Sequence, residues 1–484
     1  FGGGAGGAAN ADFDSLIDLI TSTVDVDSWM DNGTGQGDIQ PFPTGVYVDA
    51  KGALRVERSG ARATALASVS ARQPAPPVGS DDESGKPVTD ADAPDARTPS
   101  RLRFVSLPRL ERAIAARQAQ HEPLDPAMLT LAGLQRVEFV AVYPETGDLI
   151  LAGPAGDWRS QRGALVSAET GQPVVRLDDW LTLLRRRAAE GATPFGCAIV
   201  PRQEALAATQ EYLARTSSEP LKAGGRGQWL ADLRDALGEQ DVEFYHLESS
   251  TRVARLILAA DYHMKLIGMG LAKGVPGVPS YLDTVRLGPD GQPPAMSVIR
   301  WWFSMPVSRV EASADGRVFA LPEHCVEVLS ENELLAARGE RIHTGESDEL
   351  TSGFARAFTE HFGDLAAKYQ VYGELERVFE LALAMAVIEQ EGLLQQVDWQ
   401  PEHLLNAERL RLPRVTTPST VETVVNHRVI ARRHVIAGVS GGVWIDPRKQ
   451  AEMTAMAETD RAVQVTAGAQ AAAANAAEPV WWWD

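Results

Sequence analysis

The most regular hydrophobic pattern in the chain lies in residues 251–271. In TRVARLILAADYHMKLIGMGL, apolar side chains recur every three or four residues, which places them on one face of a helix. That face comprises Val253, Leu256, Ile257, Ala260, Met264, Ile267 and Leu271. Asp261 and Lys265 are four residues apart on one flank of this face, and His263 lies on the other flank. The pattern predicts a long core helix with polar residues beside its apolar face.

Strand and helix patterns alternate densely over residues 102–342. Two alternating runs, 137–142 and 148–152, flank the turn sequence Glu145-Thr146-Gly147 and predict a hairpin. Further helices are predicted at 178–189, 202–215 and 228–237, and further strands at 196–200, 242–247, 297–304, 309–313 and 317–321. We therefore expect a mixed α/β core over residues 102–342, with two subdomains as an alternative to one.

Three further segments carry their own patterns. Residues 11–58 predict a helix that begins near Ser15 and a hairpin of strands 45–49 and 53–56. Residues 349–397 predict a helical hairpin, because Leu350, Phe354, Phe358, Phe362 and Leu365 form one stripe. Residues 398–450 are rich in strand signals. The predicted class is α+β: small mixed α/β modules, a helical hairpin and a β-rich C-terminal segment.

Residues 73–100 lack the composition of a folded module. They contain no aromatic residue and many Pro, Asp and Ser residues, so they cannot bury enough apolar surface to offset the entropy of ordering them. We interpret this stretch as a disordered-like acidic linker.

The end of the sequence also differs in composition from the rest. Residues 451–484 include the alanine-rich stretch 467–477 and then Trp481, Trp482 and Trp483. Each indole carries on the order of 200 Å² of surface, so we expect these rings to be buried. They could dock on their own domain, or a tether could carry them as an anchor to another subunit.

Length, charge and cysteine content narrow the class of protein. With 484 residues the chain is longer than one hydrophobic core usually supports, so several domains are expected. Its 65 acidic and 46 basic residues give a net charge of -19, which disfavours nucleic acid as a partner. No apolar run approaches about 20 residues, so no transmembrane segment is predicted. Cys197 and Cys325 could form one disulfide or remain two buried thiols.

Two residues are candidates for hydrolytic chemistry. His263 could act as a general base, but Asp261 points to the opposite flank and cannot orient it from the same helix. Ser440 lies in Gly438–Gly442, which matches the GxSxG pattern of a nucleophile elbow. The strand-like residues that follow predict a hairpin loop there instead.

Aromatic residues in the same region are candidates for binding. In a strand, Trp302 faces one side while Trp301 and Phe303 face the other, so at least one ring points away from the local core. A sugar-stacking platform and ordinary aromatic packing both fit Trp302. Tyr281 follows the proline-rich turn 274–279, which could be a binding surface or a connector. Trp302 and Tyr281 therefore join the three C-terminal tryptophans as predicted interaction residues.

No residue is assigned to catalysis, to a cofactor or to a metal. The patterns HExxH, CxxC and GxxxxGK[ST] do not occur, and the nine histidines show no spacing typical of metal ligands. His324 and Cys325 are adjacent, so in an extended segment they point to opposite faces and cannot act together.

Several longer runs are more specific than these motifs. They are DFDSLIDLITSTVDVDSWMDNG, PFPTGVYVDAKGALR, ADYHMKLIGMGL, GVPSYLD, RWWFSM and GELERVFELALAMAVI. In these runs the chain resembles an exported family of unknown function found in planctomycete bacteria. The resemblance covers most of residues 11–395 except the linker, and it implies export but no reaction, cofactor or site. A sequence that begins at Phe1 also fits removal of a secretory signal.

These observations favour a non-enzymatic structural subunit of a cell-envelope or extracellular assembly, with its own copies or other envelope proteins as partners. One alternative is an exported hydrolase, with a pocket beside Tyr262, His263, Tyr281 and the strand of Trp301 and Trp302, or, as the second choice, around Ser440. The other alternative is a glycan-binding protein that uses exposed tryptophans such as Trp302.

Overall fold

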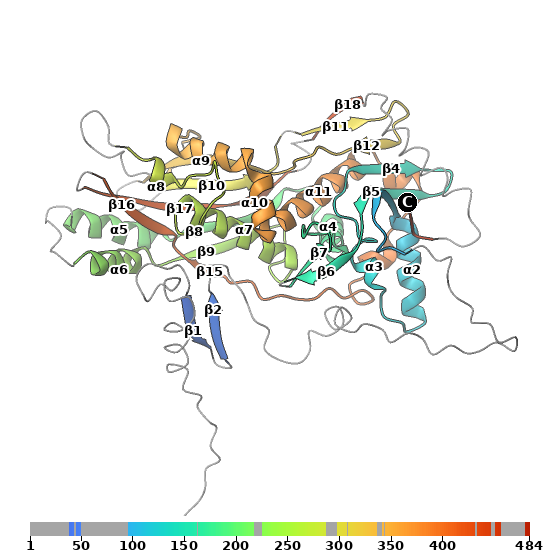
Figure 1. The fold of residues 1–484 in the computed structure, drawn as a ribbon, viewed down its shortest axis with the longest axis horizontal. Coiled ribbons are helices and arrows are strands. Elements are labelled where there is room, and N and C mark those ends of the chain that lie inside the picture. Colours follow the sequence, from blue (N-terminus) through green and yellow to red (C-terminus); the bar gives the residue numbers. More distant parts are fainter. Residues whose placement is uncertain are drawn as a thin grey trace, which may run out of the picture.

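The protein has the predicted α+β fold, with helices packed around two large sheets (Figure 1). The computed structural model describes residues 38–42, 45–49, 95–161, 163–216, 225–286, 298–306, 308–335, 341–342, 344–430, 433–446, 451–455 and 480–484. The predicted helix near Ser15, the predicted strand 53–56, most of the linker 73–100 and the alanine-rich stretch 467–477 lie outside these residues.

The larger sheet has eight strands in the order β14-β13-β10-β17-β8-β9-β15, with β16 paired to the first half of β17. Its strands are β8 (Phe195–Pro201), β9 (Glu239–Tyr245), β10 (Val298–Ser304), β13 (Glu327–Leu335), β14 (Arg341–Ile342), β15 (Thr420–Glu422), β16 (Val425–Ile430) and β17 (Arg433–Ile445). Neighbouring strands are antiparallel except β10 and β17, which are parallel. The strands predicted at 196–200, 242–247 and 297–304 are confirmed as β8, β9 and β10.

The smaller sheet has seven strands in the order β18-β11-β12-β4-β5-β3-β19. Its strands are β3 (Ser100–Ser106), β4 (Phe139–Tyr143), β5 (Asp148–Ala155), β11 (Ser308–Ala312), β12 (Val318–Ala320), β18 (Ala451–Ala455) and β19 (Trp482–Trp483). Here only β11 and β18 are parallel. The predicted hairpin is confirmed as β4 and β5. Strands β3 and β19, which are the first and the last strands of this sheet along the chain, lie side by side.

Two segments of the chain, β10 to β11 and β17 to β18, pass side by side from the larger sheet to the smaller one. Strand β10 pairs in parallel with β17 in the larger sheet, and the strands that follow each of them, β11 and β18, pair in parallel in the smaller sheet. The predicted ranges 102–342 and 398–450 therefore contribute neighbouring strands to one sheet. The domain boundaries themselves stay predictions.

Helices cover the sheets and fill the space between them. They are α2 (Leu107–Ala119), α3 (Pro126–Leu129), α4 (Leu177–Glu190), α5 (Gln203–Thr216), α6 (Arg226–Leu237), α7 (Arg252–Gly268), α8 (Tyr281–Thr284), α9 (Glu349–Glu360), α10 (Phe362–Lys368), α11 (Gln370–Gln390), α12 (Leu393–Gln396) and α13 (Glu402–Leu405). Helix α11 is central in Figure 1 and contacts α4, α7 and β4. Its residues from Val378 to Ile388 are all buried, so it joins the core of both sheets.

Helix α7 is the long core helix that the apolar stripe predicts. The stripe is buried, with only Leu271 partly exposed, and Thr251 caps the helix by accepting a hydrogen bond from the backbone N–H of Ala254. At Gly268 the helix touches β10 so closely that a Cβ atom would lie 2.4 Å from Cζ3 of Trp301. Only glycine permits this approach, which explains how the Trp301 ring can be fully buried beneath α7.

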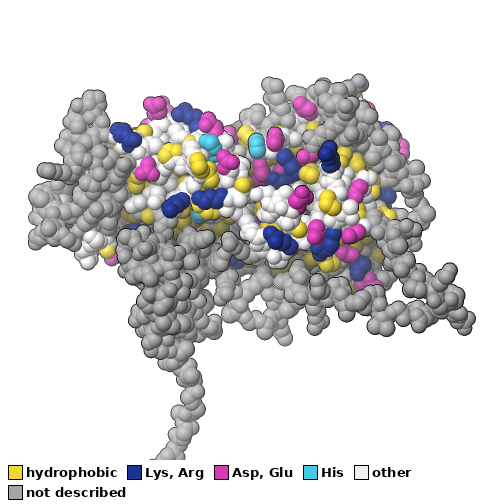
Figure 2. All heavy atoms as spheres, in the orientation of Figure 1, with side chains coloured by type: hydrophobic (Ala, Val, Ile, Leu, Met, Phe, Trp, Pro, Cys, Tyr) yellow, Lys and Arg dark blue, Asp and Glu magenta, His cyan; other side chains and the backbone are white. Residues whose placement is uncertain are grey.

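Two small antiparallel pairs lie outside the large sheets. The predicted strand 45–49 is confirmed as β2 (Gly45–Asp49), and it pairs with β1 (Asp38–Phe42), a strand that was not predicted. Strands β6 (Trp158–Gln161) and β7 (Ala164–Ser167) form a second hairpin. On the face drawn in Figure 2, acidic and basic side chains are interspersed, without a large area of one sign.

Candidate functional site

Strand β19 forms the outer edge of the smaller sheet, and the end of the chain lies there, marked C beside β5 in Figure 1. It runs antiparallel to β3, with Trp482 opposite Val105 and Trp483 opposite Phe104. One residue earlier, the carbonyl of Trp481 accepts a hydrogen bond of 2.9 Å from the backbone N–H of Ser106. The last residues of the chain are thus added to the sheet as a short extra strand.

Each indole of this strand has a defined environment. Trp482 is only 5% exposed, and the guanidinium of Arg103 lies 4.4 Å from its ring centroid. Trp483 stacks on Phe104 with ring centroids 5.8 Å apart and an interplanar angle of 11°. Trp481 is partly buried against the main core. The rings are therefore covered by their own chain, and cover by a neighbouring copy is not required to bury them.

Arg103 is the charged centre of this site. Its side chain is 0% exposed, and it donates two hydrogen bonds to the carboxylate of Asp484, from Nε to Oδ1 at 2.7 Å and from Nη2 to Oδ2 at 2.9 Å. It also donates to the carbonyls of Ala132 at 2.7 Å and Thr98 at 2.9 Å, and to that of Ala96. A buried guanidinium needs a counter-charge and partners for its N–H groups, and Asp484 supplies the charge.

A second arginine supports the strand next to this site. Arg109 on α2 pairs with the buried carboxylate of Asp148, Nε to Oδ1 at 2.8 Å and Nη2 to Oδ2 at 2.5 Å. The hydroxyl of Ser106 donates to the same Oδ1 at 2.6 Å and also caps α2. The guanidinium of Arg109 lies 5.4 Å from the ring centroid of Trp483. These contacts fix β3 and α2 in place beside β19.

The other predicted interaction residues lie elsewhere. Trp301 and Phe303 are fully buried while Trp302 is partly exposed, which matches the predicted alternation along β10. The guanidinium of Arg300 lies 4.6 Å from the centroid of Trp302 and covers part of that ring. Tyr281 is buried against Trp301, and burial raises its pKa to about 12. The structure thus brings the three C-terminal tryptophans together and separates them from Trp302 and Tyr281.

His263 lies among aromatic rings in the core. Its Nδ1 is 2.8 Å from the hydroxyl of Tyr372, and its ring meets that of Tyr369 edge-on at a centroid distance of 4.5 Å. Burial lowers its pKa to about 4, so the imidazole is neutral at neutral pH. On the other flank of α7, Asp261 and Lys265 form a fully buried ion pair of 2.7 Å. These contacts pack His263 into the core, which fits a structural role for this side chain.

Ser440 lies within a strand. Residues 438–442 belong to β17, where Ser440 is paired with Arg300 of β10. The prediction of a hairpin loop at these glycines is wrong, because the hairpin of β16 and β17 turns between Ile430 and Arg433. A strand interior also lacks the strand-to-helix turn that exposes a nucleophilic serine.

A surface depression is present at another place. It has a volume of about 700 Å³ and is lined by Ala115, Gln118, Ala119, His121, Glu122, His403 and Arg409. His403 Nε2 lies 2.7 Å from Gln118 Oε1, so two polar side chains of this depression form a hydrogen bond with each other. The residues of the predicted hydrolase pocket do not line it.

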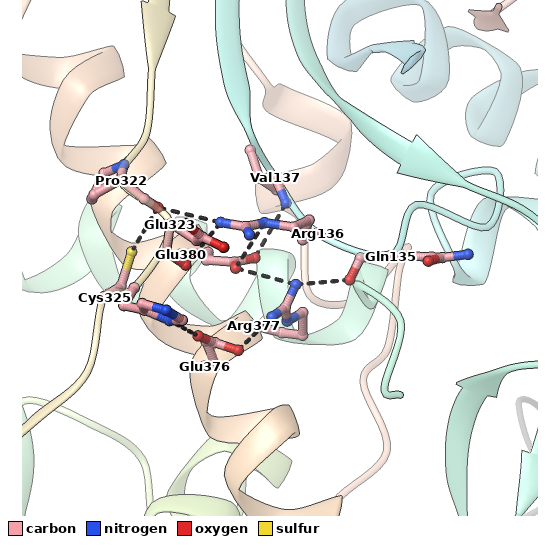
Figure 3. A network of polar contacts seen from close by, with 10 residues as sticks. Gln135, Arg136, Val137, Pro322, Glu323, Cys325, Glu376, Arg377 and Glu380 are labelled. Carbon is pink, nitrogen blue, oxygen red and sulfur yellow. Dashed lines mark hydrogen bonds and ion pairs between the residues drawn. The ribbon is translucent and has the colours of Figure 1, made fainter. Parts of the chain in front are cut away.

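Glu380 on α11 lies at the centre of a buried polar network (Figure 3). Its fully buried carboxylate lies 3.1 Å from Nη1 of Arg377 and 3.6 Å from Nε of Arg136, measured from Oε1. The backbone N–H of Val137 donates to its Oε2 at 3.2 Å. Burial raises the pKa of Glu380 to about 7, against the lowering effect of the two guanidinium groups.

The two arginines of this network connect α11 to neighbouring loops, as Figure 3 shows. Arg136 donates from Nη2 to the carbonyls of Pro322 at 3.3 Å and Glu323 at 2.9 Å. Arg377 donates from Nη1 to the carbonyl of Gln135 at 2.9 Å. The network thus holds the central helix against the segment before β4 and the segment after β12, which is a structural role.

Both cysteines are buried free thiols, so they do not form a disulfide. Cys325 lies next to the Glu380 network, and burial raises its thiol pKa, as it does for Cys197. The imidazole of His324 points to Glu376, with Nδ1 3.4 Å from Oε1. A thiol held in its neutral form is a poor nucleophile.

A comparison with known families gives one match. Residues 197–281 match a family described as a protein of unknown function, DUF1598. No curated protein and no solved structure matches the chain. The match supports a domain of unknown function, whereas planctomycete origin and export stay predictions.

The DUF1598 segment begins in β8, contains α5, α6, β9 and α7, and ends in α8. It includes the Asp261–Lys265 pair and His263 but neither the β19 site nor the Glu380 network. In the part of the chain that the structure describes, no group of three or more His, Cys, Asp or Glu side chains is placed to hold a metal ion. Among the same residues, no helix combines the length and the apolarity that crossing a bilayer requires.

Sequence reasoning did not find the arginines that organise these sites. Arg103 lies in an alternating run, RLRFVS, that ends at Ser106, two residues before Pro108, and this is the sequence of a strand followed by a capped helix. Glu380 stands alone in the apolar run 378–388, and a lone carboxylate in a core helix signals a buried cationic partner. Arg377, three residues before Glu380, is such a partner on the same helix, whereas Arg136 lies far earlier in the sequence and no local pattern connects it to Glu380.

Proposed function

We propose that the protein is a non-enzymatic structural subunit of a multi-copy assembly in the cell envelope or outside the cell. The addition of β19 to the edge of the smaller sheet carries this proposal. Strand addition at a sheet edge is a general way to join polypeptides, because backbone hydrogen bonds supply affinity and side-chain pockets supply specificity. In our proposal the C-terminal strand joins copies by this route.

The chain is long enough for β19 to reach either its own sheet or a neighbouring one. Residues 456–479 connect β18, at one edge of the smaller sheet, to β19 at the opposite edge. Crossing a seven-stranded sheet takes about 30 Å at the usual strand spacing. Fully extended, residues 456–479 reach about 80 Å. Exchange of an identical element between copies needs no new interface, so it is an accessible route to an oligomer.

The charged groups of the core also favour a structural role. The Glu380 network and the buried Asp261–Lys265 pair both hold elements of the fold together. Export is part of the proposal and rests on the resemblance of the sequence runs to an exported family.

Trp482→Ala is expected to shift the protein from a multi-copy form to single chains. Truncating a buried tryptophan costs about 3–5 kcal/mol, which corresponds to a loss of more than a hundredfold in affinity for a joint that depends on this ring. Light scattering over a range of concentrations measures the change. The wild-type chain should exceed the mass of one chain, and the variant should not.

Trp302→Ala is the matched control, because it removes a partly exposed indole from the larger sheet and should leave the mass unchanged. A wild-type chain that stays monomeric at every accessible concentration would refute the proposed assembly.

A further inference from the structure

We infer that the outer edge of β3 is an acceptor site for the Trp-Trp-Trp-Asp segment of a second copy of this chain. The inference rests on the proposed function, since it names the partner that the site joins. Its acceptor part consists of Arg103, Phe104, Val105 and Ser106 of β3 with Arg109 of α2. Its donor part is the segment 480–484, which occupies this edge in the structure.

The acceptor is organised by contacts that do not involve the donor. The carbonyls of Ala132 and Thr98 hold the guanidinium of Arg103, and Asp148 holds that of Arg109. Both cations are therefore already oriented toward the edge where the indoles bind. A site that is ordered before binding does not lose that ordering entropy on association.

The acceptor also needs a partner with a negative charge. Arg103 is fully buried, and its carboxylate partner in the structure is Asp484. Without the donor segment, Arg103 would lose the two hydrogen bonds that its Nε and Nη2 donate to Asp484. The outer edge of β3 would also lose its neighbouring strand. A guanidinium that loses its counter-charge and a strand edge that loses its partner are both less favourable than the paired state, so the site favours an extended acidic segment.

The donor segment matches the acceptor position by position. Trp481 accepts the backbone hydrogen bond from Ser106, Trp482 lies under Arg103, and Trp483 stacks on Phe104. Asp484 then reaches Arg103 with both carboxylate oxygens. Two aromatic contacts and a two-pronged ion pair in fixed register give specificity for aromatic residues followed by an acid.

A peptide in solution tests the acceptor directly. The probe is Glu-Pro-Val-Trp-Trp-Trp-Asp, residues 478–484, with a fluorescent label at its N-terminus. The receptor is the full-length chain with Trp482→Ala, whose own tail competes weakly. Fluorescence anisotropy should show saturable binding, and replacing the peptide's aspartate with asparagine should weaken it about tenfold, because the bidentate ion pair is lost. Replacing its middle tryptophan with alanine should weaken binding further.

A second measurement identifies the source of the donor. Excess probe peptide should dissociate the wild-type oligomer, since it competes with the tail of the neighbouring copy, whereas the asparagine peptide should need about tenfold more. If Trp482→Ala fails to fold by circular dichroism, the full-length chain with Asp484→Lys replaces it as the receptor.

The outcomes separate this inference from the proposed function. No saturable binding to a folded receptor would overturn the inference, and so would equal binding of the aspartate and asparagine peptides. Binding by the peptide together with a monomeric wild-type chain would retain the acceptor site and refute the assembly. If excess peptide does not dissociate the oligomer, the copies contact each other through another surface. That result would overturn the inference that the donor comes from a second copy.

Discussion

Lys265→Met is expected to lower the free energy of unfolding by about 3–5 kcal/mol. Lys265 and Asp261 are both 0% exposed on α7, and Nζ donates to Oδ2 at 2.7 Å. Removing the ammonium leaves a carboxylate in the core without its charged partner. Burial already raises the pKa of Asp261, so in the variant the carboxyl group should take up a proton, and that also costs free energy at neutral pH.

The double variant Asp261→Leu with Lys265→Met separates charge from packing. Replacing both members of a buried ion pair by apolar side chains is often neutral or stabilising, so most of the lost stability should return. Urea denaturation of the wild type, both single variants and the double variant gives the coupling free energy directly. A double variant as unstable as Lys265→Met would mean that the side-chain volume, and not the pair of charges, matters at this position.

The elements that sequence predicts well are those with a long local period. The apolar stripe of α7 and the patterns of α4, α5 and α6 locate these helices to within a few residues, because a buried helical face repeats over several turns. Strand β13 was not predicted, since its residues EVLSENELL mix charged and apolar side chains without a clear alternation. The local hydrophobic pattern therefore predicts the type of an element, but it identifies only some of the strands.

The sheet order is not contained in any local pattern. The parallel pairing of β10 with β17 joins residues 299–304 to residues 439–444, and the intervening chain folds into helices and other strands. The glycines of β17 illustrate the difficulty. Their sequence indicates a turn, whereas in the structure Gly442 lies so close to β8 that a Cβ atom would stand 2.1 Å from the carbonyl oxygen of Cys197. Close strand packing, and not a turn, requires glycine here.

The C-terminal site likewise combines a feature that the sequence predicts with one that depends on long-range packing. Composition alone predicts that Trp481, Trp482 and Trp483 are buried, because three indoles are unfavourable in water. It does not identify the surface that buries them, since that surface is a strand edge almost four hundred residues earlier whose key feature is the buried Arg103. Docking on the same chain was one of two alternatives, and the structure shows that arrangement.

The protein's stability is expected to fall by about 3 kcal/mol through Glu380 alone as the pH rises from about 4.5 to about 7. The pKa of this carboxyl group is about 7 in the fold, against 4.5 for an exposed glutamate. Between these values the folded state keeps a proton that the unfolded state releases. Stability is therefore full below about pH 4.5 and declines with rising pH until the folded group also ionises, the reverse of the usual behaviour of a carboxylate.

Glu380→Gln isolates this effect, because glutamine stays neutral in both states. Other buried acids titrate in the same window, including Asp179, whose pKa burial raises to about 6, but they are present in both proteins and cancel in the difference. Denaturation at several pH values should show the variant gaining about 3 kcal/mol on the wild type between pH 4.5 and 7.5. A difference that moves the other way would mean that Arg136 and Arg377 outweigh burial and hold the carboxylate ionised, because stability would then be lost as the pH falls.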